Sequence, residues 1–205
     1  MEQKNGKLYV ITGPSGVGTG EIVERVLAAR PELVTVTPVT ARKMKKGEEN
    51  GKGFFFYDLD TWQRMKDSGE LLETTVLMGN DYGTSRTLIE RELRQGRSVI
   101  LQLEPDRAAQ VKRSMPESVC LLIAPQDEAE LARRYAATAR GNFELPVRLE
   151  IARQQCETAA AFCDATIDSG ELESAVAELD ALMQKTETTG VIVGADALGG
   201  PCGTD

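Results

Sequence analysis

Short apolar runs alternate along the chain with stretches whose apolar residues recur every three to four positions. The first run, residues 8–11, is followed by a glycine-rich turn and then by a stretch in which the recurring apolar residues are Ile22, Val23, Val26 and Leu27. A short apolar run is typical of a buried strand, and the longer period is typical of a helix with one buried face. The pattern therefore predicts a strand, a tight turn and a helix that ends at Arg30-Pro31.

The same alternation predicts the remaining elements. Strands are expected at residues 33–37, 54–59, 71–78, 98–103, 119–123 and 165–167. Helices are expected at residues 61–68, 87–95, 107–114, 127–139, 146–162 and 171–185, the first of them capped by Asp60 or Thr61. This order implies an α/β fold in which helices cover both faces of a mostly parallel sheet. Ligands of such folds bind at the carboxyl ends of the strands, where the glycine-rich turn lies.

Two segments depart from the alternation. Residues 54–78 form a strand-rich insertion with only one short helix. Residues 186–205 are rich in Gly, Thr and Ala and have no sustained period, so we expect a flexible tail with room for one short strand at residues 191–193.

The glycine-rich turn has the spacing of a phosphate-binding loop. Gly13 and Gly18 stand five positions apart, as in G-x-x-x-x-G-K-[ST], where backbone N–H groups and a helix N-terminus surround an anion. The lysine of that motif is replaced by Thr19, and Glu21 adds a carboxylate where a hydroxyl is preferred. Strand-to-helix turns also use glycine for steric reasons alone, but the preceding strand and the correct spacing favour a phosphate loop.

Composition limits the classes of function. A chain of 205 residues with 41% hydrophobic content can bury one core, which predicts one domain with an appendage. A net charge of −8 argues against general nucleic-acid binding. No apolar run approaches the roughly 20 residues that span a bilayer, and the first residues lack a signal-peptide core, so we expect a cytoplasmic protein without membrane partners.

The chain has no histidine, which excludes Ser-His and Cys-His catalysis. Its four cysteines, at positions 120, 156, 163 and 202, form no CxxC pair, so neither a zinc site nor a disulfide framework is indicated. Chemistry is left to carboxylates, arginines, lysines, hydroxyls and the backbone. Residues 40–54 are locally basic; such a stretch is usually a solvated loop, but beside a phosphate loop it can also bind a second anion.

Four segments together resemble bacterial guanylate kinase from residue 7 to about residue 184. They read GPSGVG, VTPVTARKMKKGEENGKGFFF, GELLETTVLMGNDYGTSR and GRSVILQLEPDRAAQVK, in the family's order and at its spacings. The resemblance implies a P-loop NTPase-type parallel sheet flanked by helices, with a small β-rich GMP-binding insertion and a helical lid. It implies a kinase domain at 1–185, with its core at about 1–33 and 85–185, the insertion at 34–84 and the lid at 134–148. The implied reaction moves the γ-phosphoryl group of Mg-ATP to GMP, giving ADP and GDP.

The resemblance also implies residue roles. The ATP phosphate loop would comprise Gly13, Pro14, Ser15, Gly16, Val17, Gly18, Thr19 and Gly20. The GMP phosphate would be held by Arg42 and Lys45, where the family has two arginines, and Phe54 replaces a tyrosine whose hydroxyl also touches that phosphate. A lysine keeps the charge but loses the bidentate fork of an arginine.

Glu73 matches the glutamate that reads guanine, because a carboxylate offers two acceptors to the adjacent N1–H and N2–H₂ donors. Tyr82 and Thr84 match residues near the phosphate and base, and Gln102 and Glu104 replace an acidic pair near the metal and guanine. Mg²⁺ is implied to enter with ATP, and no residue is assigned as a metal ligand.

The catalytic arginines implied by the family are Arg42, Arg134 and Arg148. Arg140 substitutes for a further one if the alignment shifts slightly, and Arg153 matches a basic position; for helix arginines of this kind, solvent exposure is the ordinary alternative.

Three functions stay open on these residues. The first is a slow guanylate kinase in which Lys43, Lys46 or a lid arginine partly replaces the missing loop lysine. The second is a non-catalytic nucleotide-sensing or partner-binding module, favoured by the concentration of changes at Thr19, Glu21 and Gln102. The third is a kinase for another acceptor such as a phosphorylated sugar, against which Glu73 argues. The sequence does not indicate an oligomeric state.

Overall fold

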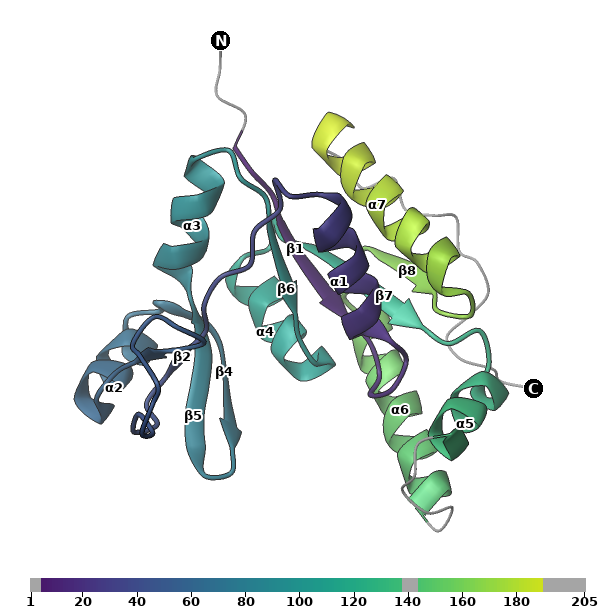
Figure 1. Ribbon diagram of the computed structural model, residues 1–205, viewed down its shortest axis with the longest axis horizontal. Helices are drawn as coiled ribbons and strands as arrows, with labels where there is room; N and C mark the ends of the chain where they lie inside the picture. Colours follow the sequence, from purple (N-terminus) through teal and green to yellow (C-terminus); the bar gives the residue numbers. More distant parts are fainter. Residues whose placement is uncertain (1–4, 138–143, 190–205) are drawn as a thin grey trace.

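The computed structural model describes residues 5–137 and 144–189. A parallel sheet with the strand order β6-β1-β7-β8 forms the core (Figure 1). Its strands are β1 (Leu8–Thr12), β6 (Val99–Gln102), β7 (Val119–Ala124) and β8 (Ala165–Asp168). Every residue of β1 is buried, as expected for a central strand covered on both faces. The predicted α/β fold class is therefore confirmed.

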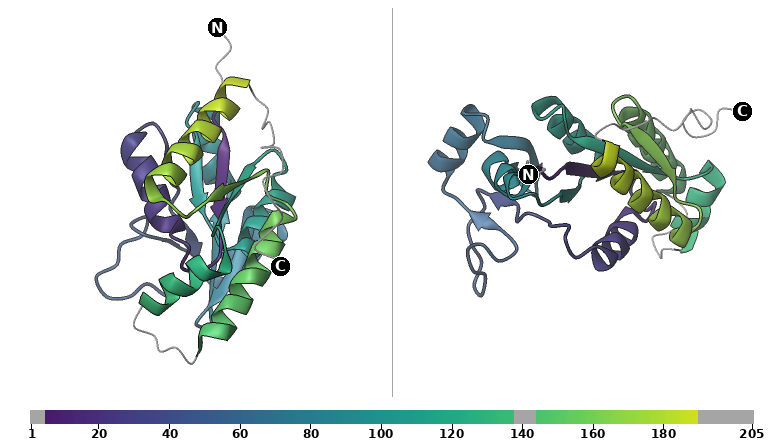
Figure 2. Two further views of the ribbon diagram at one scale, coloured as in Figure 1. Left: turned by 90° about the vertical axis from the view of Figure 1, so that its right-hand side faces the viewer. Right: turned by 90° about the horizontal axis from the view of Figure 1, so that it is seen from above.

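Helices cover both faces of this sheet (Figure 2). On one face lie α1 (Thr19–Ala29) and α7 (Leu172–Thr189); on the other lie α4 (Pro105–Ser114) and α6 (Leu145–Ala160). Successive side chains of β1 divide between them: Tyr9 and Ile11 pack with α1 and α7, whereas Leu8 and Val10 pack with α4. Two further helices are α3 (Arg86–Arg94) and α5 (Glu128–Ala137), the latter packed on α6.

A second, mixed sheet lies beside the core with the strand order β3-β2-β5-β4 (Figure 1). It contains β2 (Val39–Thr40), β3 (Phe55–Phe56), β4 (Leu71–Leu77) and β5 (Asn80–Ser85), and α2 (Leu59–Asp67) packs on it through Trp62. We call this unit, residues 39–85, the acceptor module. The strand-rich insertion that the sequence predicts is present, and its domain boundaries stay a prediction.

Two predicted strands are wrong in extent. Between residues 33 and 37 only Val34 pairs, adding one bridge to the outer edge of β6, because the chain is already crossing to the acceptor module. The aromatic stretch 54–59 keeps only Phe55–Phe56 as strand, since Asp58 accepts a hydrogen bond from the Thr61 N–H at 2.7 Å and starts α2. The N-cap is thus Asp58, and not Asp60 or Thr61.

The polar segment Asn80–Ser85 forms a strand that the apolar pattern does not indicate. It pairs with β4 across a two-residue turn at Met78 and Gly79, which have φ angles of 49° and 73°. Positive φ at both positions is the hairpin geometry that favours glycine, so the Met-Gly-Asn sequence is the signal that identifies this strand.

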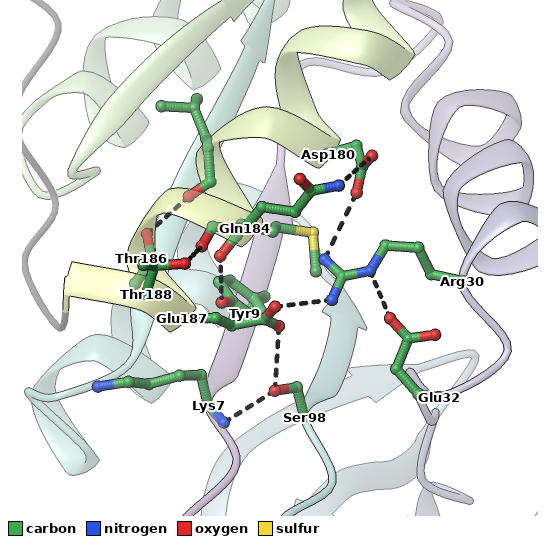
Figure 3. Close-up of polar contacts among 12 residues, drawn as sticks. Lys7, Tyr9, Arg30, Glu32, Ser98, Asp180, Gln184, Thr186, Glu187 and Thr188 are labelled. Atoms are coloured by element: carbon green, nitrogen blue, oxygen red, sulfur yellow. Dashed lines mark hydrogen bonds and ion pairs between the residues drawn. The ribbon is translucent and has the colours of Figure 1, made fainter. Parts of the chain in front are cut away.

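Helix α7 continues four residues beyond its predicted end at Lys185 and reaches Thr189. Its last turns are attached to the core by the contacts drawn in Figure 3. Arg30 donates to Glu187 at 2.7 Å and to Asp180 at 3.4 Å, and the Tyr9 hydroxyl donates to the Met183 carbonyl at 3.0 Å. Burial, and then the nearby Glu187 carboxylate, raises the pKa of Tyr9.

Of the tail expected at 186–205, residues 186–189 belong to α7 instead, and the rest, including the suggested strand at 191–193, lies outside the described residues. Within residues 5–137 and 144–189, no helix is long and apolar enough to cross a membrane. The cysteines in these ranges form no disulfide.

Candidate active site

The glycine-rich turn joins the end of β1 to the start of α1, as the sequence predicts. Gly16 and Gly18 adopt φ angles of 87° and 97°, in the left-handed region that favours glycine. At Gly13 the constraint is space, because a Cβ atom would lie 2.4 Å from the Ile123 carbonyl oxygen. No side chain caps α1, so its first N–H groups remain directed at the turn, where they can bind an anion.

Helices α5 and α6 support the back of this loop. The Ser15 N–H donates to Gln155 Oε1 at 3.1 Å, and the Tyr135 hydroxyl donates to the Ser15 carbonyl. Arg134 donates to the carbonyls of Val17 and Ser169, each at 2.7 Å. The loop backbone is therefore held by two neutral side chains, Gln155 and Tyr135, and by the guanidinium of Arg134.

The two predicted lid arginines are thus placed behind the loop. Arg134 also pairs with Glu130 at 2.7 Å, and the guanidinium carbon of Arg148 lies 3.8 Å from the centroid of the Tyr135 ring. Neither belongs to the residues that line the cavity in front of the loop. Their catalytic roles stay predictions, and Arg140 lies outside the described residues. Arg153 pairs with Glu150 and Glu157 on the half-exposed face of α6, the ordinary alternative for a helix arginine.

A cavity of about 460 Å³ opens in front of the loop. The loop contributes one wall, β4 contributes a second, and the carboxyl end of β6 with the first turn of α4 contributes a third. The lining residues are Gly13, Pro14, Ser15, Gly16, Gly18, Thr19, Gly20, Thr75, Leu77, Gln102, Leu103, Glu104 and Arg107. The cavity therefore joins the phosphate loop to the acceptor module.

Thr19, at the position of the motif's lysine, puts a neutral side chain in this wall. Its hydroxyl is buried and finds no hydrogen-bond partner within the described part of the chain. Glu21 lies in the first turn of α1, is exposed, and has its carboxylate 3.5 Å from the Arg25 guanidinium. Solvent screens such a pair, and the effect of Glu21 on bound phosphates stays a prediction.

In the acceptor module, Arg42 forms a fork with Glu48: the two Nη–Oε distances are 2.9 and 2.8 Å. The guanidinium lies 5.5 Å from the ring centroid of Phe54 and 5.1 Å from that of Phe56. The pair with Arg42 lowers the pKa of Glu48 to about 2. Arg42 is thus held by an internal carboxylate, and its role in binding an anion stays a prediction.

Tyr82 stacks edge-on against Phe54 at a centroid distance of 5.5 Å, which places both near Arg42. Lys45 is exposed, and its backbone N–H, not its ammonium group, donates to Glu48 at 2.6 Å. Glu48 is not predicted from the sequence, where it is one of two adjacent glutamates in a locally basic loop.

Glu73 is completely buried, and three donors occupy its two oxygens. The Thr84 hydroxyl donates at 2.7 Å, and Arg107 donates from Nε at 2.7 Å and from Nη2 at 2.9 Å. Arg107, and not Glu73, lines the cavity. Arg107 was also missed, although its position one turn beyond a strand end is where site residues of α/β folds lie.

Gln102 and Glu104 are exposed at the carboxyl end of β6 and line the same cavity. Within the described ranges, no three acidic, cysteine or histidine side chains gather into a metal-binding group. Mg²⁺ in nucleotide sites is held by one or two carboxylates together with phosphate oxygens and water. The carboxylate of Glu104 and the amide oxygen of Gln102 can supply the protein ligands of Mg²⁺ bound with a nucleotide. Two such ligands are too few for a metal site formed by the protein alone.

Comparisons of the sequence and of the fold with known proteins identify the family. The family model described as guanylate kinase matches residues 5–186. The guanylate kinase of Prochlorococcus marinus (strain MIT 9313) is 39% identical over 179 residues, covering 87% of this chain and 94% of the relative. That of Synechococcus sp. (strain CC9902) is 37% identical, covering 88% and 96%. The crystal structure of guanylate kinase from Anaplasma phagocytophilum has a TM-score of 0.65 at 25% identity, covering 92% and 90%. The chain therefore belongs to the guanylate kinase family.

Proposed function

We propose that this protein transfers the γ-phosphoryl group of Mg-ATP to GMP, giving ADP and GDP. The observation that carries the proposal is the shared cavity, in which the phosphate loop faces β4 of the acceptor module and the strand end at Gln102 and Glu104. A kinase needs its donor and acceptor phosphates in one space from which water is excluded, and this arrangement provides two adjoining half-sites.

On the donor side, the loop backbone binds the ATP phosphates through the N–H groups at the start of α1. Glu104 and Gln102 are the residues that would hold Mg²⁺, which supplies charge neutralisation when it is bound with ATP. The loop adds no cation at Thr19. Loss of one preorganised donor costs about 2.7–4 kcal/mol, or roughly 10²–10³ in rate, so we propose a slow kinase.

On the acceptor side, Arg42 binds the GMP phosphate, with Tyr82 beside it and Phe54 in place of a hydroxyl donor. The phosphate needs no general base, because it is already ionised, and the absence of histidine is no obstacle. The base lies toward the pair formed by Glu73 and Arg107. Arg134 and Arg148 act on the phosphates only after they leave their contacts with Val17 and Tyr135.

The test is a coupled assay with GMP and Mg-ATP at high enzyme concentration, with Arg42→Ala as the control. We expect turnover that the control loses. Turnover of the native protein no faster than that of Arg42→Ala would contradict the proposal. Calorimetry with GMP and with Mg-ATP, done separately on the same preparation, shows which half-site binds.

A second function is favoured by one observation, the neutral Thr19 in the loop wall. The protein would then be a GMP-binding module without phosphoryl transfer. Calorimetry would find binding of GMP but not of Mg-ATP, and the coupled assay would show no turnover above Arg42→Ala.

A further inference from the structure

The carboxylate that the family resemblance assigns to guanine recognition does not face the cavity. The Glu73 side chain has 0% exposure, while the Arg107 side chain has 22% and lines the cavity in its place. Both oxygens of Glu73 accept hydrogen bonds from Arg107, and one also accepts from the Thr84 hydroxyl. Any base that enters therefore meets a guanidinium before it meets a carboxylate.

Displacing Arg107 would leave a buried carboxylate with the Thr84 hydroxyl as its remaining hydrogen-bond partner. Removing one partner of a buried ion pair is strongly unfavourable, because the other charge stays in a poorly solvated place. The bidentate geometry with Nε and Nη2 adds to the stability of the pair. We therefore expect the pair to persist when a ligand binds.

The free donors of Arg107 define what it can recognise. A guanidinium has five N–H donors, and Glu73 uses one on Nε and one on Nη2. Both hydrogens of Nη1 and the second hydrogen of Nη2 have no partner within the described residues. The Nη1 and Nη2 hydrogens form the second bidentate edge of the planar group, so this wall of the cavity presents two adjacent donors.

Two adjacent donors match the O6 and N7 acceptors of guanine, the edge that arginine commonly reads in nucleic acids. They do not match the N1–H and N2–H₂ donors that a free carboxylate would bind. Adenine places an amino group at position 6, so it presents a donor against a donor. Hypoxanthine has the same O6 and N7 acceptors as guanine but lacks the 2-amino group.

We propose that Arg107, anchored by Glu73, is the specificity-determining residue of the acceptor site. It selects 6-oxopurine monophosphates through O6 and N7 and leaves the 2-amino group unread, so IMP binds about as well as GMP. This inference rests on the proposed function, because it takes a purine monophosphate as the acceptor.

The test is calorimetry of the full chain with GMP, IMP and AMP. We expect the Kd for IMP to lie within about fivefold of that for GMP, and the Kd for AMP to be at least about tenfold weaker, as expected for one bidentate base contact. IMP binding more than about tenfold weaker than GMP would overturn the inference while leaving the proposed function intact. If none of the three binds, the proposed function fails as well.

Variants sharpen the result. Arg107→Ala uncovers the Glu73 carboxylate, so the preference for GMP over IMP should rise by about tenfold or more. Arg113→Ala is the matched control, since Arg113 lies exposed on the same helix and does not line the cavity. If Arg107→Ala does not fold, Arg107→Lys keeps the charge beside Glu73 without the planar edge and should lose discrimination against AMP. Nucleotide preferences equal to those of the native protein in the folded variant would overturn the inference.

Discussion

The two halves of the cleft hold their polar groups in different ways. In the donor half, residues 13–20 are positioned by backbone contacts with Gln155, Tyr135 and Arg134, and the loop itself offers no cation. In the acceptor half, Arg107 in the cavity wall is positioned by the Glu73 carboxylate, and Arg42, which does not line the cavity, is positioned by the Glu48 carboxylate. The donor half thus has the backbone of a phosphate loop without the lysine of the motif. The acceptor half has its arginines, and each of them is paired with a carboxylate.

The difference separates two requirements of a phosphotransferase. A backbone loop can bind phosphates through N–H groups, but charge that develops in the transition state needs a cation at short range. Paired arginines can recognise an acceptor by sharing their remaining donors, because each carboxylate leaves part of the guanidinium unused. We therefore expect acceptor binding to be better preserved than phosphoryl transfer.

The largest effect should come from returning a cation to the donor half. Thr19→Lys should raise kcat by about 10²–10³, since it supplies the charge that the loop lacks next to the β- and γ-phosphates. Steady-state assays with GMP and Mg-ATP measure the change. Thr19→Val, which removes the hydroxyl without adding charge, is the control and should give no gain. No increase with lysine would show that the defect of the donor half is not one of charge.

A smaller effect is expected from removing the cation of the acceptor phosphate. Arg42→Ala should weaken GMP binding by about 10- to 100-fold, because it removes charge-assisted hydrogen bonds to the GMP phosphate, which are stronger than neutral ones. Calorimetry with GMP measures it. Lys45→Ala should change the Kd less than about threefold, since the Lys45 side chain is exposed and makes no fork. An equal change in the Kd for GMP in both variants would show that the paired arginine binds the phosphate no better than the exposed lysine does.

Arg30 provides a paired arginine outside the cleft (Figure 3). It bonds Glu32, Asp180 and Glu187 and joins α1 to α7, so Arg30→Ala should lower the free energy of unfolding by about 1.5–3 kcal/mol and leave the Kd for GMP unchanged. Urea unfolding and calorimetry on the same variant test both statements. Arg25→Ala removes a largely exposed pair with Glu173 and should cost less than about 1 kcal/mol. A loss of GMP affinity in Arg30→Ala would show that the ion pairs of the core also shape the cleft.

The sequence predicts the core sheet better than the acceptor module, for a physical reason. Core strands such as β1 are buried on both faces and appear as apolar runs. Strand β5 is polar, and its pairing with β4 depends on backbone hydrogen bonds and on the turn at Met78 and Gly79. The segment 33–37 has β-branched residues but crosses between the two sheets, so propensity alone gave the wrong element there.

The candidate site divides in the same way. The loop glycines follow from spacing, and the acceptor residues follow from family motifs. Neither the spacing nor the family motifs predict which carboxylate pairs with each arginine. Glu73 and Arg107 are 34 positions apart, so their contact depends on the fold. The same holds for Arg134, whose guanidinium is directed to the Val17 carbonyl and not to the cavity.

The smallest effect concerns the charge state of Glu48. The pair with Arg42 lowers its pKa to about 2, below its ordinary value of 4.5, so the pair contributes stability above about pH 4.5 and loses it as the pH falls toward about 2. The difference in Tm between the native protein and Glu48→Gln should therefore be constant from about pH 8 to about pH 5 and shrink on further acidification. Glu49→Gln is the control, because Glu49 pairs with the exposed Lys52 and should give little difference at any pH. A difference that grows in acid would mean that Glu48 is protonated in the fold, and that Arg42 already stands free for phosphate.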